Sequence, residues 1–353
     1  MDVVSDAISA VRLGQPSSSR VRVSGNWCTR LAPYDGAGFH VVLEGGCWLL
    51  PDGGPPVSLG AGDAVLLPHG TGHVIADSPV DAVAVERAVP FERWLDGTVP
   101  RRPEAVSGGG PGAAAGEVAM VCGKYRLDRS RVHPLMAELP EVVHLPNRVG
   151  SHPELRSVID LLGRELGGQQ PGSCMAIPSL LDLFLIYVLR SWIAEGASGA
   201  WPGVLGDPVA AAALRALHSD PSAPWTNDRL AAEAGVSRPT LARRFTALVG
   251  RPPMAYLTWW RLTLAATQLR DTPDPLAAIA RRVGYGTPYA LSHAFSREFG
   301  TSPGRYRAEI AAGRTTPRAR GRHLAGSRPL SLPPREPLPL ASAGAATEVP
   351  RRP

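Results

Sequence analysis

The chain has 353 residues, which is room for two domains and a tail, and its 37 lysine and arginine side chains outnumber 31 acidic ones. The excess lies towards the carboxyl terminus: residues 1–206 carry 16 basic against 21 acidic side chains, residues 207–312 carry 13 against 8, and residues 313–353 carry 8 against 2. This asymmetry favours a phosphate-binding module joined to a second domain, and four cysteines without paired spacing argue against a zinc finger.

The amino-terminal 90 residues show short apolar alternations separated by glycine and proline, which are typical of strands in a small β-barrel or sandwich. The first residues are neither basic nor apolar enough for a secretory signal, so we expect a cytoplasmic location. The predicted strands are residues 21–27, 39–50, 63–70, 73–77 and 82–88.

Two short patterns in this region are more specific. The spacing G-x5-P-x-G-x2-H-x3-D over residues 62–77 resembles the second motif of cupin barrels, in which the last position is usually asparagine. His40 and Glu44 resemble the later half of the first cupin motif, and Gly38 stands where that motif has its first histidine.

The cupin resemblance leaves two interpretations open. Two histidines and a carboxylate can hold iron or zinc with open positions, so His40, Glu44 and His73 are candidate ligands of a divalent metal in an enzyme fused to the basic carboxyl-terminal module. Alternatively, they line a pocket for an organic effector without a cofactor. We favour the second, non-enzymatic interpretation, because one ligand of the motif is missing and a domain attached to a phosphate-binding module is expected to sense a ligand and not to turn over a substrate. The predicted effector pocket comprises His40, Glu44, Trp48, His73 and Asp77.

The middle of the chain is predicted to be helical. Residues 97–116 are rich in glycine and proline and are expected to form a flexible connection, followed by helices over residues 155–167 and 180–195. The apolar run 175–194 has the length of a membrane span, but Asp182 and Arg190 would cost several kcal/mol in lipid. We therefore expect no membrane contact. We also expect a homodimer formed through residues 150–200.

The carboxyl-terminal half contains an internal repeat. The pattern of residues 230–257 recurs over residues 279–307, and each copy reads as a short helix, a glycine turn and a second helix, which is typical of a helix-turn-helix motif. Ser237 and Thr287 stand at N-cap positions, each with a proline in the following turn. Two such motifs on one chain indicate double-stranded DNA as a partner.

The second copy carries V-G-Y-x-T and F-G-x-S-P-x-x-Y-R, and it resembles the signature of the AraC/XylS family of bacterial transcription regulators. The resemblance covers roughly residues 10–312. It implies that the two motifs flank a linking helix, residues 255–270, and enter successive major grooves. Carried over position by position, the family's groove-facing sites are Pro239, Ala242 and Arg243 in the first motif and Pro288, Tyr289 and His293 in the second. The predicted set of DNA-contacting residues also includes Arg238, Thr240, Arg244, Thr287, Ser292 and Arg297.

These positions differ in what they can read. The Arg243 guanidinium suits bidentate contact to guanine, whereas the family commonly has arginine at the position of His293. We therefore expect the first motif to specify sequence and the second mainly to position the protein.

The expected fold class is α+β and multidomain. It has a cupin-like β-barrel with appended helices over residues 1–200, an all-α domain of two helix-turn-helix motifs over residues 207–312, and a disordered basic tail over residues 313–353. The implied function is a bacterial transcription activator that responds to a small molecule or a stress signal, with RNA polymerase as a further partner.

Overall fold

The structure is a computed structural model that describes residues 3–80, 82–95, 117–127, 133–168, 170–196 and 200–311. The predicted flexible connection and basic tail fall outside these residues.

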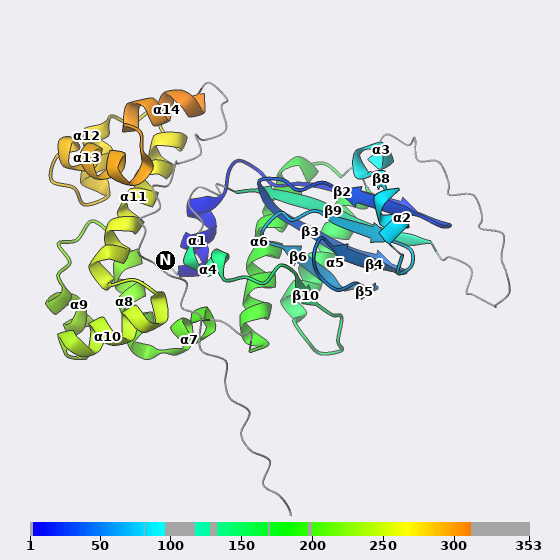
Figure 1. Cartoon of the computed structure of the whole chain (residues 1–353), viewed down its shortest axis with the longest axis horizontal. Coiled ribbons are helices and arrows are strands. Elements are labelled where there is room, and N and C mark those ends of the chain that lie inside the picture. Colours follow the sequence, from blue (N-terminus) through cyan, green and yellow to red (C-terminus); the bar gives the residue numbers. More distant parts are fainter. Residues whose placement is uncertain are drawn as a thin grey trace, which may run out of the picture. The chain divides into compact units, whose positions relative to one another are not determined.

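The strands of the described part form two five-stranded sheets (Figure 1). The first has the order β1 (Ser17–Val23), β9 (Val118–Arg126), β3 (Gly36–Glu44), β6 (Ala64–Leu67) and β10 (Val143–Leu145). The second has the order β5 (Val57–Gly60), β4 (Gly46–Pro51), β7 (His73–Ala76), β2 (Cys28–Leu31) and β8 (Val89–Pro90). Since no strand pairing among the described residues joins the sheets, the predicted barrel appears as two sheets and not as a closed barrel.

The first sheet is covered on both faces. Successive side chains of a strand point to opposite faces, and in β3 Phe39 and Val41 belong to the core that includes helices α5 (Pro153–Gly167) and α6 (Ser173–Ala194). Val42 belongs instead to the core shared with the second sheet, and His40 points the same way. This two-sided burial explains the run of seven buried residues in β3.

Several predicted elements need correction. Residues 82–88 were expected to be a strand, but helix α2 covers Ala82–Glu86, in keeping with the helix propensity of alanine and glutamate. Helix α6 begins at Ser173 and not at residue 180, and Pro178 lies inside it. The helices α1 (Val3–Val11), α3 (Phe91–Leu95), α4 (Pro134–Ala137) and α7 (Ala200–Gly206) were not predicted.

Helix α6 is long and apolar enough to cross a membrane by length and composition alone. In the structure it packs as a core helix instead: Leu181, Phe184 and Leu185 are buried against the first sheet and α5. Asp182 forms an ion pair with Arg12, so the charge within the apolar run has a partner.

The carboxyl-terminal part is all helical, as predicted (Figure 1). Its linking helix packs in both hydrophobic cores of this part, and Leu264 contacts the two. The predicted inward residues Leu291, Phe295 and Phe299 are buried. The helices are α8 (Pro208–Ser219), α9 (Asn227–Glu233), α10 (Arg238–Val249), the linking helix α11 (Pro253–Asp271), α12 (Leu276–Arg282), α13 (Pro288–Phe299) and α14 (Pro303–Ala311).

Candidate DNA interface and effector pocket

The two candidate recognition helices, α10 and α13, begin in the same way. The Ser237 hydroxyl accepts a hydrogen bond from the Thr240 amide at 3.4 Å, and the Thr287 hydroxyl accepts one from the Ala290 amide at 3.1 Å. Both helices end at a glycine in the left-handed conformation, Gly250 with φ 77° and Gly300 with φ 68°. These local signals explain why the sequence alone located both motifs.

All twelve predicted DNA-contacting side chains lie at least partly at the surface. Their contact with DNA remains a prediction. The most exposed aromatic side chain of the group, Tyr289, is 84% exposed at the start of α13. The exposed positions are Arg238, Pro239, Arg243, Arg244, Thr287, Tyr289, His293 and Arg297, and the half-buried ones are Thr240, Ala242, Pro288 and Ser292.

Two adjacent arginines of α10 differ in their surroundings. Arg244 Nη2 lies 2.7 Å from Asp207 Oδ2, and Asp207 also caps α8 by accepting from the amide of Ala210 at 2.9 Å. Arg243 is exposed and has no ion-pair partner within the described part of the chain. Its guanidinium is therefore available for a ligand, whereas that of Arg244 is already neutralised.

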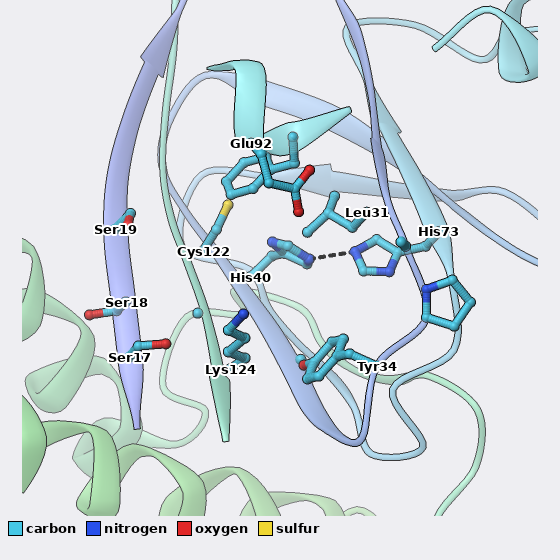
Figure 2. Close-up of a pocket in the computed structure, with 15 residues that line it drawn as sticks. Ser17, Ser18, Ser19, Leu31, Tyr34, His40, His73, Glu92, Cys122 and Lys124 are labelled. Atoms are coloured by element: carbon cyan, nitrogen blue, oxygen red, sulfur yellow. Dashed lines mark hydrogen bonds between the residues drawn. The ribbon is translucent and has the colours of Figure 1, made fainter. Parts of the chain in front are cut away.

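A pocket of about 340 Å³ opens between the two sheets (Figure 2). A volume of this size is within the range of small-molecule sites. Of the predicted pocket residues, His40 and His73 line it. The remaining lining comes from Ser17–Ser19 of β1, residues 31–34, Gly38 of β3, Phe91 and Glu92 of α3, and Cys122–Lys124 of β9.

The two histidines of the pocket contact each other directly. Their Nε2 atoms are 2.8 Å apart, and His73 Nδ1 lies 3.2 Å from the carbonyl oxygen of Thr71. Because that oxygen can only accept, His73 carries its proton on Nδ1 and accepts through Nε2, so His40 donates from Nε2. Burial lowers the pKa of His73 to about 4, and burial together with His73 lowers the pKa of His40 well below its ordinary value. Both imidazoles are therefore neutral at pH 7.

A tyrosine occupies the space in which the cupin motif would have its first histidine. A Cβ atom built on Gly38 would lie 2.8 Å from the Tyr34 hydroxyl oxygen. A side chain at position 38 therefore requires Tyr34 to move. In this chain the pocket has an aromatic hydroxyl where the motif would have a metal ligand.

The other predicted pocket residues lie elsewhere. Glu44 follows an irregularity in the pairing of β3 with β9, and its carboxylate pairs with Arg22 at 3.1 Å on the surface. Asp77 accepts from the Trp27 amide at 3.3 Å, and Trp48 lies on β4 opposite Ala76. These three residues are therefore not among the lining residues of the pocket.

The donor set for a metal is correspondingly small. His40 and His73 converge, but Glu44 is engaged by arginine. Among the residues that the structure describes, no group of three or more His, Cys, Asp or Glu side chains is arranged to hold a metal ion.

The buried cysteines of this domain are not reactive thiolates. Burial raises the pKa of Cys47 to about 12, and burial also raises the pKa of Cys122, which lines the pocket.

A buried chain of hydrogen bonds joins α1 to the helical part. His218 Nδ1 lies 2.9 Å from Asp6 Oδ2, His218 Nε2 lies 2.8 Å from the Tyr256 hydroxyl, and that hydroxyl lies 3.2 Å from His133 Nε2. All three contacts are satisfied when His133 donates to Tyr256, Tyr256 donates to His218, and His218 donates to Asp6. Burial, followed by the nearby His218, lowers the pKa of His133 well below its ordinary value, which agrees with a neutral His133.

Sequence reasoning missed the pocket residues outside β3 and β7. Strand β9 follows the predicted flexible connection, and β1 pairs with it across about a hundred residues of sequence. Lys124, the single lysine of the chain, was the one local signal that could have identified this strand as unusual.

Comparisons with known proteins match both parts of the chain. A family model described as Cupin matches residues 2–194, and one described as Helix-turn-helix domain matches residues 230–309. A protein of Streptomyces antibioticus described as an AraC-like transcription regulator is 35% identical over 310 residues, which span 87% of this chain and 98% of that protein. A protein of Streptomyces lividans with the same description is 34% identical over equal shares. A solved structure of the DNA-binding domain of AdpA, a global transcriptional factor in complex with a target DNA, is 34% identical and covers 31% of this chain and 99% of its own, with a TM-score of 0.29.

Proposed function

Because the chain belongs to the AraC family of transcription regulators, we propose that the pocket between its two sheets binds the effector that controls DNA binding. The observation that supports this proposal is that the pocket is lined by a strand next in the chain to a helix that packs in the core of the DNA-binding part. Ser17–Ser19 of β1 line the pocket, and β1 directly follows helix α1. Val3 and Ala7 of α1 belong to the same hydrophobic core as helices α8, α10 and α11.

This connection offers a route for the signal. The segment between α1 and β1 is held to β9 by a hydrogen bond from the Leu13 amide to the Arg126 carbonyl oxygen, at 2.8 Å. Helix α1 itself is held to the DNA-binding part by the contact between Asp6 and His218. A ligand that favours one position of β1 therefore favours one position of α1, and the DNA-binding helices respond to the resulting population.

The rest of the proposal follows from family membership and from the sequence. The protein acts in the cytoplasm as an activator, binds double-stranded DNA and contacts RNA polymerase. It has no catalytic role and needs no metal: the neutral pair of His40 and His73 orients a ligand by hydrogen bonding.

Substitution of the pocket histidines tests the effector site. We expect His40→Ala and His73→Ala to change the transcriptional response in a reporter strain while leaving the effector-free affinity of the full-length protein for DNA unchanged, because each removes a polar group only from the pocket. His152→Ala, a histidine that does not line the pocket, is the matched control. Two variants that fold and respond as the wild type does would place the signal elsewhere.

A dimer through α5 and α6 is a further expectation. These helices expose large apolar side chains: Leu161 is 41%, Leu183 is 42% and Met175 is 81% exposed. Pairing of two DNA-binding modules on one site raises affinity without new contacts to DNA. We expect light scattering to show a dimer at micromolar concentration, and Leu161→Glu combined with Leu183→Glu to convert it to a monomer. Val83→Glu, at an exposed valine of α2, should leave the dimer intact; a monomeric wild type, with or without DNA, would contradict the proposal.

A further inference from the structure

Two opposite charges line the effector pocket and form no ion pair with any residue that the structure describes. Lys124 comes from β9 and Glu92 from the first turn of α3, and both side chains are exposed. Within the described part of the chain, neither forms an ion pair or a hydrogen bond. Neighbouring charges of the same domain do so: Arg30 pairs with Asp52 at 2.7 Å, and Arg22 pairs with Glu117 at 3.2 Å.

The two charges face the same space. Lys124 lies two residues after Cys122 and therefore points to the same face of the first sheet, towards the second sheet. Its ammonium nitrogen is 5.7 Å from the centre of the Tyr34 ring. In Figure 2 the Lys124 ammonium and the Glu92 carboxylate lie on opposite sides of the His40 imidazole, and both are turned towards it.

The surface between these charges is apolar or neutral. Leu31, Pro33 and Phe91 contribute apolar area, and Tyr34 contributes an aromatic ring. His40 belongs to a neutral pair and adds no charge. A pocket of about 340 Å³ with a cation at one side, an anion at the other and an apolar surface between them is complementary to a molecule with the reverse order of charges.

We infer that the pocket takes a compact molecule with an anionic group at one end, a protonated amine at the other and a ring-sized apolar body between them. This inference rests on the proposal that the pocket is the effector site. The Lys124 ammonium pairs with the anionic group, the Glu92 carboxylate pairs with the amine, and the ring packs on Tyr34 and Phe91. A ligand charged at one end alone leaves one of the two protein charges without a partner.

Three probes that share one skeleton test this assignment on the full-length protein. Calorimetric titration with 4-(aminomethyl)benzoate, 4-methylbenzoate and 4-methylbenzylamine compares the zwitterion with each single charge. Exposed ion pairs contribute modestly, so we expect the zwitterion to bind about fivefold more tightly than either of the others.

The variants assign each end of the probe. Lys124→Met should weaken the two carboxylates about fivefold and leave 4-methylbenzylamine unaffected, whereas Glu92→Gln should weaken the two amines and leave 4-methylbenzoate unaffected. Arg126→Met removes an exposed cation from the same strand outside the pocket and should change none of the three affinities. Because Lys124 and Glu92 are exposed, unchanged melting temperatures are expected.

The outcomes separate this inference from the effector proposal. Equal affinity of the three probes, or no binding of any at millimolar concentration, would overturn the ligand class. If Lys124→Met and Glu92→Gln then still change the reporter response, the effector site stands and only its ligand chemistry is wrong. If the probes discriminate as expected while the reporter response of both variants is normal, the ligand class holds and the effector proposal fails.

Discussion

Replacement of His218 by alanine is expected to lower the free energy of unfolding by about 3 to 5 kcal/mol, the usual cost of leaving a buried charged group without its partner. The His218 side chain is fully buried, and Asp6 is buried with it. The substitution also removes the stacking of the imidazole on Trp260, whose ring centre is 4.4 Å away. Denaturant unfolding followed by tryptophan fluorescence measures the loss, because Trp260, one of the eight tryptophans of the chain, lies in this cluster.

The matched control for His218 is Arg215→Ala on the same helix, at an exposed position. It should change stability by no more than about 0.5 kcal/mol. A double-mutant cycle with Asp6→Ala then isolates the pair, since two residues in direct contact should show a coupling of about 0.5 to 3 kcal/mol. Additive losses in that cycle would mean that α1 is not held to α8 by this contact.

The same cluster carries a functional expectation. Tyr256→Phe keeps the buried ring but removes the hydroxyl that joins His218 to His133, and leaves one buried donor and one buried acceptor without that partner. If α1 transmits the state of the pocket through this cluster, the transcriptional response of the variant to inducing conditions should be weaker than that of the wild type. The decrease should be larger than the small loss of stability accounts for. This cluster lies outside the reach of sequence patterns, because 212 residues separate His218 from Asp6.

Local signals explain which parts of the fold the sequence could predict. The helix-turn-helix motifs depend on N-caps such as Ser237 and Thr287 and on apolar residues at helical spacing, and all of these act within a dozen residues. The strand predicted at residues 82–88 was wrong because alternating alanine and valine fit an amphipathic strand and a short helix equally well. Only burial decides between them.

The pocket illustrates the non-local case. His40 and His73 were predicted from motif spacing and do converge, but Glu44 was misplaced because the irregular pairing after Val42 turns it towards Arg22. The position of Lys124 and Glu92 in the pocket could not be predicted, because strand pairing and the packing of α3 bring them there. Motif spacing therefore predicted the two histidines of the pocket, whereas pairing between distant strands determines which other residues line it.

Arg243→Ala is expected to weaken binding to the specific DNA site by about 1 to 3 kcal/mol and binding to random DNA only slightly, because a bidentate contact to guanine is made only at the correct base pair. The specific site is obtained by selection from a random pool with the wild-type protein, and affinities for both DNAs are then measured at one salt concentration. The adjacent Arg244→Ala is the matched control. Its guanidinium is held by Asp207 at 2.7 Å, so its loss should not alter base preference. Equal losses on both DNAs for Arg243→Ala would make Arg243 a phosphate contact and would move sequence reading to the other exposed side chains of α10 and α13.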